Sequence, residues 1–345
     1  MNLFLNQKIL TKNCSNMQTQ IKKIDHSSIL EAKEILNNGG VVAIPTETVY
    51  GLAGIGYDSS AVKEIFRVKG RPSDNPLIAH VHKDFPLDSL VYIEQDYVFD
   101  LIKSFMPGPL TLVFRSKNIV CKEAVCGGET LAVRMPSHEG CQQLLKEINA
   151  PLVAPSANLS KHTSPVTASH VYNDLNGKIP LILDGGKCEG GIESTVLDIT
   201  GKVPRILRAG LVTKEMIESV CGAVEIAEHK EGDKIKSPGV KYTHYKPKCD
   251  TVLFEENQLE DAENYYNDLV EKGKTPFIMC SDEVAEKLGQ KNFLKLGKNK
   301  KEIASNLYDK LLEGEVKADV IIAIALPDED GISMGIMNRM RKSCG

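Results

Sequence analysis

The 345-residue sequence contains no tryptophan, and aromatic residues make up only 6% of it. Proteins that bind single-stranded nucleic acid stack bases on aromatic side chains, so this composition argues against an extended stacking surface. Charge is nearly balanced, with 42 Lys and Arg against 46 Asp and Glu. A bulk positive field that would attract nucleic acid is therefore absent, although a local basic patch stays compatible with the sequence.

Long apolar segments are missing as well. The longest uninterrupted apolar run, Val320 to Leu326, covers seven residues, whereas a membrane helix needs roughly 20. We therefore expect no membrane contact. Residues 1–25 lack the features of a secretory signal, which favours a cytoplasmic protein. Residues 1–20 follow no pattern, so we expect a disordered extension, and Met17 is an alternative start.

Signatures of metal and phosphate sites are also lacking. The nine cysteines form no CxxC pair and have no neighbouring histidine at zinc-ligand spacing. We interpret them as reduced thiols and expect no metal site. No GxxxxGK[ST] loop occurs, so any nucleotide must be held by another arrangement.

Short apolar runs that alternate with helical stretches predict an α/β fold. In the first part of the chain, strands are expected at 41–44, 77–81, 110–114, 131–133, 152–154, 181–183 and 196–199, and helices at 28–38, 61–69, 95–105, 139–148 and 213–221. In the last part, strands at 251–254, 276–279 and 319–325 alternate with helices at 258–272, 281–289, 299–313 and 333–342. We expect a mixed-sheet domain over 21–225, a charged linker over 226–248 and a small doubly wound domain over 249–345.

Four polar segments lie beside predicted strands or helix ends, where α/β sheets usually bind ligands. They are PTETVYGL at 45–52, KGRP at 69–72, SAN at 156–158 and IEST at 192–195. For PTET alone, a hydroxyl-rich loop that satisfies its own backbone is an equally good interpretation.

Several cations in or near these segments suit an anionic ligand. Lys69 and Arg71 flank a glycine, so an ammonium and a guanidinium can face one polyanion, and phosphate is the natural guest. The alternative is a solvated helix end whose cations only answer the helix dipole. Arg134 ends a predicted strand, and Arg205 and Arg208 flank Ile206-Leu207. Each of the three would either pair with a surface acid or grip a substrate carboxylate.

His80 and His82 alternate along a predicted strand and so share one face. Two histidines without a third ligand make metal binding the less favoured hypothesis, and hydrogen bonding at a ligand edge is preferred.

Taken one by one these segments are ambiguous, but their occurrence in this order along one chain is typical of a single protein family. They are PTETVYGLAG at 45–54, KGRPSDNPLIAHV at 69–81, PGPLT at 107–111, TLAVRMP at 130–136, APSANLS at 154–160, IESTV at 192–196 and RILRAG at 205–210, followed by SPGVKYTHYKP at 237–247 and GIMNRMRK at 335–342. With these motifs the chain closely resembles the YrdC/Sua5 family, in the long, Sua5-type form of the threonylcarbamoyl-AMP synthases. The resemblance implies a YrdC-like twisted mixed sheet followed by a small Rossmann-like domain.

The resemblance also implies a reaction. L-Threonine, bicarbonate or CO2, and ATP would give threonylcarbamoyl-AMP and pyrophosphate for the t6A modification of tRNA, with Mg2+ arriving on the ATP. A TsaD-type threonylcarbamoyl transferase would use the product, and a tRNA contact is conceivable.

Carried onto this sequence, the family pattern assigns two sets of residues. It places L-threonine against Thr48, His80, Arg134 and Ser194. It places ATP against Lys69, Arg71, Asn75, Thr130, Ala154, Ser156, Asn158, Ser164, Arg208 and Tyr242, with Lys69 and Arg71 as the catalytic cations. Tyr242 and Tyr245 would fold over the nucleotide as a lid, unless the linker is an ordinary tether.

Two other interpretations compete with the synthase. A hydrogenase-maturation carbamoyltransferase shares the YrdC-like domain but should carry zinc-type cysteine pairs, which this sequence lacks. An RNA-binding or ribosome-assembly module is the alternative from a different class. Such a module needs cations and aromatic residues, but has no use for a threonine-specific pocket.

Overall fold

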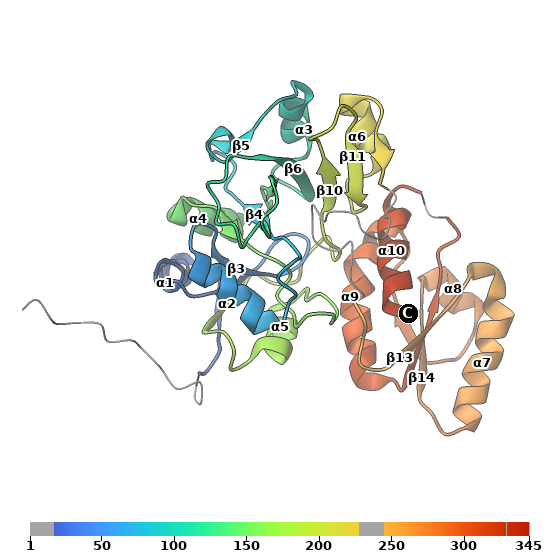
Figure 1. Cartoon of the computed structure of the whole chain (residues 1–345). Coiled ribbons are helices and arrows are strands. Elements are labelled where there is room, and N and C mark those ends of the chain that lie inside the picture. The colour runs from blue at the N-terminus through green and yellow to red at the C-terminus, as the bar shows by residue number, and fades with distance from the viewer. Residues whose placement is uncertain (1–16, 228–244, 329, 345) are drawn as a thin grey trace, which may run out of the picture.

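The computed structural model describes residues 17–227, 245–328 and 330–344, which form two sheet domains (Figure 1). The first domain is built on a mixed sheet and the second on a parallel one. Two helices of the second domain, α9 (Lys300–Lys317) and α10 (Ile332–Cys344), lie between the two sheets. The contact between the domains is therefore made by helices.

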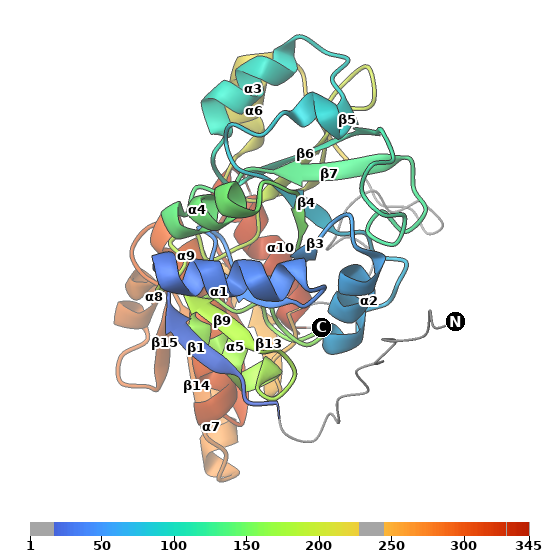
Figure 2. The ribbon, with the colours of Figure 1, turned by 90° about the vertical axis from the view of Figure 1, so that its left-hand side faces the viewer.

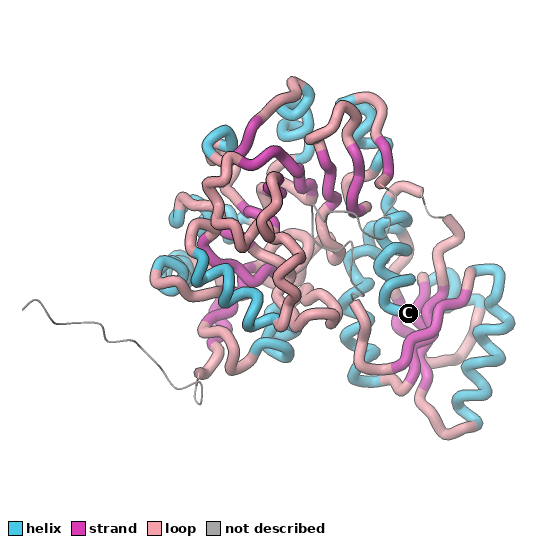
Figure 3. The backbone as a smooth tube through the Cα atoms, viewed as in Figure 1, coloured by secondary structure: helices cyan, strands magenta, loops and turns pink. Residues whose placement is uncertain are grey.

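The mixed sheet has the strand order β1-β9-β2-β3-β8-β4-β7-β6-β10-β11-β12, with β5 paired to β6. The strands are β1 (Gln20–Lys23), β2 (Val42–Ile44), β3 (Gly51–Ile55), β4 (Ile78–His80), β5 (Val91–Tyr92), β6 (Leu110–Ser116), β7 (Thr130–Arg134), β8 (Leu152–Val153), β9 (Leu181–Asp184), β10 (Thr195–Asp198), β11 (Arg205–Arg208) and β12 (Glu225–Ile226). Parallel and antiparallel pairs alternate irregularly along it, and Figure 3 shows its strands in magenta.

Helices cover both faces of this sheet (Figure 2). They are α1 (His26–Asn37), α2 (Ser59–Lys69), α3 (Tyr97–Phe105), α4 (Glu139–Ile148), α5 (Ala168–Leu175) and α6 (Lys214–Cys221), with a short 3-10 turn at Leu87–Ser89. Side chains alternate along a strand, so Val42 and Ile44 pack with α1 and α4 in one core. Ala43, between them, joins the larger core that also receives α2 and α5.

The second sheet is parallel, with the strand order β13-β16-β14-β15. Its strands are β13 (Asp250–Phe254), β14 (Pro276–Cys280), β15 (Phe293–Lys295) and β16 (Val320–Ile324), and its remaining helices are α7 (Leu259–Glu271) and α8 (Asp282–Lys287), after a 3-10 turn at Glu256–Gln258. All five residues of β16 are buried, as expected for a central strand covered on both faces.

The expected α/β class is confirmed, with several local differences. Helix α1 begins earlier than expected, because Asp25 is its N-cap and forms a capping box with Ser28. Strand β3 was not expected, since its glycines weaken the strand signal. A Cβ at Gly54 would lie 3.2 Å from Ile65 Cδ1, so close packing against α2 favours glycine there.

The expected domain limits remain predictions. The limit at residue 225 falls within β12, which pairs with β11. The expected extension at 1–20 and the linker at 226–248 lie largely outside the described residues.

Candidate active site

Sheet register brings four of the expected site residues to neighbouring strands. His80 ends β4 and pairs with Arg134, which ends β7. Arg134 pairs with Thr111 of β6, and Thr111 pairs in turn with Val196 of β10. Val196 pairs with Arg208 at the end of β11, and Ser194 directly precedes β10. Residues that are far apart in sequence therefore meet along one line across the sheet.

Lys69 approaches this line from the last turn of α2. Its ammonium is buried and donates hydrogen bonds to the main-chain carbonyls of Ser156, at 2.5 Å, and Asn158. Burial, followed by the nearby Arg71 charge, lowers the pKa of Lys69 well below its usual value, and Asp174 opposes the shift. The KGR and SAN segments are thus joined by one buried cation.

Arg71 follows the glycine that ends α2. Gly70 adopts a left-handed conformation at φ 59°, and Arg71 Nε then donates to the carbonyl of Asn75 at 3.2 Å. Burial lowers the pKa of Arg71 to about 10, so the guanidinium stays charged at neutral pH. The interpretation of Lys69 and Arg71 as merely solvated cations at a helix end does not fit Lys69, which is 3% exposed.

His80 is a neutral group in this site. Its Nδ1 lies 3.0 Å from the carbonyl oxygen of Ile78, to which it donates. Burial, reinforced by Arg134, lowers the pKa of His80 to about 3. The imidazole can therefore exchange hydrogen bonds at neutral pH without carrying charge.

Arg134 and Arg208 are both buried, and hydrogen bonds to neighbouring residues fix both side chains. Arg134 Nη2 donates to Glu47 Oε1 at 2.6 Å. Arg208 Nε donates to the carbonyl of Ser194 at 3.0 Å, and its Nη2 to the Ser194 hydroxyl at 3.1 Å. The Ser194 hydroxyl also lies 2.8 Å from that of Thr111. Both guanidinium groups are thus oriented before any ligand arrives.

These side chains surround one pocket with a cavity volume of about 60 Å³. Ten expected site residues line it, namely Lys69, Arg71, His80, Arg134, Ala154, Ser156, Asn158, Ser164, Ser194 and Arg208. Ligand clefts usually measure about 300–1,000 Å³, so a nucleotide would have to widen this one. Tyr245, at the end of the expected linker, forms part of the wall.

Of the expected site residues, three do not line this pocket and a fourth lies outside the described residues. Thr48 is buried behind it, with its hydroxyl 3.0 Å from that of Thr46. Asn75 is buried beside Arg71, and its Oδ1 has no hydrogen-bond partner in the structure. Thr130 lines a second hollow, at the far end of β7. Tyr242 lies outside the described residues. Their roles stay predictions.

Two acidic residues of the site were not expected from the sequence. Glu47 pairs with Arg134, and Glu193 lines the pocket beside Ser194. Glu47 belongs to the polar segment PTET and Glu193 to the polar segment IEST. The available signal was the presence of a carboxylate in a segment otherwise composed of hydroxyl and apolar residues.

The described residues offer no ready-made metal site. No group of three His, Cys, Asp or Glu among them could hold a metal ion. Glu193 is the carboxylate that lines the described pocket, and its two oxygens accept hydrogen bonds from Ser164, Tyr308 and Arg339. A metal ion held by the protein therefore does not fit here. Within the described ranges, no helix combines the length and apolar character needed to cross a membrane.

The mixed sheet, which gathers buried cations, hydroxyl groups and amides around one pocket, has the architecture of a YrdC-like domain. The Sua5–YciO–YrdC family model, described as "Telomere recombination", matches residues 34–210. The model described as "Threonylcarbamoyl-AMP synthase, C-terminal domain" matches residues 212–345. Escherichia coli YciO, at 23% identity and a TM-score of 0.50, shares the fold over 57% of this chain and 97% of its own.

Relatives with curated names cover nearly the whole chain. The threonylcarbamoyl-AMP synthase of Bacillus subtilis is 39% identical, over 92% of this chain and 93% of the relative. That of Pyrococcus abyssi is 38% identical, over 94% and 96%. The structure of P. abyssi Sua5 complexed with L-threonine has a TM-score of 0.86 at 37% identity, over 95% of this chain and 97% of that one.

The chain therefore belongs to the threonylcarbamoyl-AMP synthase family, in its two-domain Sua5 form. The family, fold class and synthase activity expected from the sequence are confirmed. ATP is a substrate of that activity.

Proposed function

We propose that the pocket at the strand ends is where this chain forms threonylcarbamoyl-AMP from L-threonine, bicarbonate or CO2, and ATP. The observation that carries the proposal is the convergence of ten expected site residues on one pocket. Four of them are cations, and Lys69, Arg71 and Arg208 are the three expected against the triphosphate.

The reaction brings two anions together. The amine of L-threonine takes up CO2 as a carbamate, and a carbamate oxygen then attacks the α-phosphorus of ATP while pyrophosphate leaves. Lys69, Arg71 and Arg208 would offset the repulsion between carbamate and phosphate and stabilise charge on the leaving group. Since these cations are already fixed by main-chain carbonyls, little reorganisation is needed when charge develops.

Arg134, His80 and Ser194 would recognise L-threonine. The Arg134 guanidinium is suited to a carboxylate, while neutral His80 and the Ser194 hydroxyl can bind the amine and the hydroxyl of the substrate. A pocket that hydrogen-bonds the hydroxyl would reject amino acids that lack it, because its own buried polar groups would then be unpaired.

Magnesium enters this proposal as part of the MgATP substrate, since the described pocket does not supply ligands for a resident ion. Tyr245 supports the proposed lid, because it lines the pocket and its carbonyl accepts a hydrogen bond from Thr163 Oγ1 at 3.2 Å. A TsaD-type transferase and tRNA remain proposed partners, and they would place the enzyme in the cytoplasm.

Pyrophosphate release by the purified protein tests the proposal. MgATP and bicarbonate are supplied with L-threonine, L-serine or L-valine. We expect release that depends on L-threonine and is lost in folded Lys69→Ala and Arg71→Ala variants. A folded protein that binds ATP but releases no pyrophosphate with any of the three amino acids would contradict the proposal and favour the RNA-binding alternative.

A further inference from the structure

The carboxylate of Glu193 is a meeting point of the two domains. Its Oε1 accepts a hydrogen bond from Ser164 Oγ of the first domain at 2.6 Å. Its Oε2 accepts from Tyr308 Oη of α9 at 2.9 Å and from Arg339 Nε of α10 at 3.1 Å. The Arg339 side chain is 0% exposed and that of Glu193 is 9% exposed, so this contact is shielded from water.

Arg339 also holds the main chain of two neighbouring segments, beside β10 and β11. Its Nη1 donates to the carbonyl of Ala209, and its Nη2 donates to that of Glu193 at 3.5 Å. Ala209 directly follows Arg208, and Glu193 directly precedes Ser194. One guanidinium of the second domain therefore stabilises the two segments that carry these pocket residues.

Glycines allow the helices to approach these segments closely. A Cβ at Gly191 would collide with the carbonyl of Ala304 in α9, and one at Gly335 of α10 would lie 3.2 Å from Cα of Gly210. The second domain thus packs directly against the backbone of the loops before β10 and after β11.

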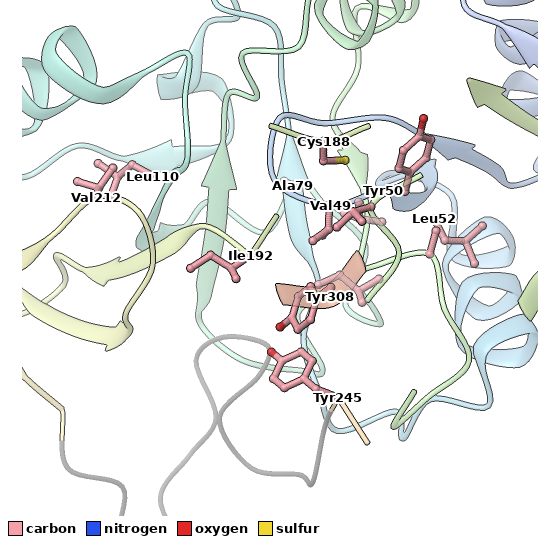
Figure 4. Close-up of a cluster of buried hydrophobic side chains, with 14 of the residues drawn as sticks. Val49, Tyr50, Leu52, Ala79, Leu110, Cys188, Ile192, Val212, Tyr245 and Tyr308 are labelled. Atoms are coloured by element: carbon pink, nitrogen blue, oxygen red, sulfur yellow. The ribbon is translucent and has the colours of Figure 1, made fainter. Parts of the chain in front are cut away.

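Tyr308 reaches the pocket wall by a second route. Its ring stacks on that of Tyr245, with the centroids 5.2 Å apart and the planes at 28° (Figure 4). Burial raises the pKa of Tyr308 well above its usual value, and the Glu193 charge adds to this effect. The hydroxyl therefore remains protonated and able to donate to Glu193.

Glu193 itself stays ionised. Burial would raise its pKa, but Arg339 and then Arg208 outweigh burial and lower it to about 2. An ionised acceptor makes stronger hydrogen bonds than a neutral one. Removing Arg339 would leave this charge buried and poorly compensated.

We propose that Arg339 and Tyr308 are positioning residues for the synthase reaction. Through Glu193 they fix Ser164 and Ser194, and through Ala209 Arg339 fixes Arg208. The second domain then completes the substrate pocket of the first without touching the substrates. This inference rests on the proposed function of the pocket.

Steady-state kinetics of Arg339→Met, Arg339→Lys and Tyr308→Phe test the inference. Pyrophosphate release gives kcat and the KM values for L-threonine and ATP, and thermal unfolding gives Tm. Lys291→Met is the matched control, because it breaks the ion pair of Lys291 with Glu263, at 2.7 Å, within the second domain. Both partners lie outside the lining of the pocket.

We expect Arg339→Met to raise the KM for L-threonine and the KM for ATP, each roughly tenfold, the effect of losing one charged hydrogen bond. Arg339→Lys should recover part of the loss, and Tyr308→Phe should raise both KM values about threefold, since only a hydroxyl is removed. Lys291→Met should leave both KM values unchanged. A merely structural role would reduce the fraction of active enzyme, which lowers the apparent kcat but not KM.

Wild-type KM values in folded Arg339→Met and Tyr308→Phe would overturn the inference, as would a fall in kcat alone. If Arg339→Met does not fold, Tyr308→Phe decides, because it keeps the ring that stacks on Tyr245. A folded wild-type protein without threonine-dependent pyrophosphate release would overturn the proposed function, and this inference with it. Active wild type with unaltered variants would overturn the inference alone.

Discussion

Arg134 Nη2 lies 2.6 Å from Oε1 of Glu47, and the second oxygen of that carboxylate accepts a hydrogen bond from the backbone N–H of Ser137 at 3.0 Å. Arg134 is the last residue of β7 and Glu47 belongs to the PTET segment, and both side chains are nearly buried. The cation proposed to bind the substrate carboxylate therefore already has a carboxylate partner, which fixes its orientation.

Replacing Glu47 separates its orienting role from its charge. Glu47→Gln keeps an acceptor for Arg134 and removes a negative charge near the incoming L-threonine carboxylate, so we expect its KM for L-threonine to change by less than about threefold. Glu47→Ala removes the acceptor as well, and we expect a rise of roughly tenfold. Kinetics of pyrophosphate release with varied L-threonine measure both. Equal effects of the two substitutions would contradict an orienting role.

Ser194→Ala should weaken the discrimination between amino acids. It removes the hydroxyl that lies within hydrogen-bond distance of Arg208 Nη2 and of Thr111. We expect kcat/KM for L-threonine to fall roughly 10- to 100-fold, with a much smaller change for L-valine, because only a hydroxyl-bearing substrate uses the lost group.

The control for Ser194→Ala is Thr195→Val at the next position. The Thr195 hydroxyl is also buried, but it donates to the carbonyl of Val212 at 2.6 Å, away from the pocket lining. This variant should lose stability and keep the wild-type ratio of the two substrates. The same loss of discrimination in both variants would argue against a substrate contact at Ser194.

His80 should make the protein sensitive to acid. Burial, with Arg134, lowers its pKa from 6.5 to about 3, so between these values the unfolded chain binds a proton that the folded protein does not. The contribution is complete above pH 6.5 and is lost as the pH falls through 3. By pH 5 about 2 kcal/mol of this contribution has been lost.

Urea unfolding of the wild type and of His80→Asn at pH 7 and pH 5 measures this effect. Asn offers a side-chain N–H in place of Nδ1–H and does not titrate, so its free energy of unfolding should fall less on acidification than that of the wild type. An equal fall in both proteins would show that His80 does not carry the expected shift.

Lys69 should make the free energy of unfolding depend on pH in the alkaline range. Its pKa is lowered in the folded protein, by burial and then by Arg71. Below the usual value of 10.5 the unfolded chain therefore holds more protons, and the free energy of unfolding should rise with pH there. Relative to that of Lys69→Met, the free energy of unfolding of the wild type should rise by at most about 1.4 kcal/mol per pH unit.

Urea unfolding between pH 7 and pH 9.5 compares the wild type, Lys69→Met and Lys63→Met. Lys63 lies on the same helix, but its side chain is 67% exposed and pairs with Glu123 at 3.4 Å. Lys63→Met should therefore follow the wild type. Parallel curves for the wild type and Lys69→Met would mean that burial does not perturb the Lys69 ammonium.

Sequence patterns gave a good account of elements with strong periodicity. The buried strand at 320–324 and the amphipathic helix at 300–317 were expected nearly as they are found. In such segments the spacing of the apolar residues directly reflects which face is buried. Strands β1, β3 and β12 were not expected. β1 pairs with β9, and β3 pairs with β8 as well as with its neighbour β2. Partners as far along the chain as β9 and β8 cannot be identified from local sequence.

The sequence by itself determined the family and the chemical groups of the site, since KGR, SAN, EST and the basic strand ends are local strings whose residue types suit an anionic ligand. The tertiary structure decided which of them meet. Parallel register between β4 and β7 places His80 beside Arg134, and α10 carries Arg339 to Glu193, 146 positions earlier in the chain. Neither contact has a local signal, because both follow from the order of the strands and from the packing of one domain on the other.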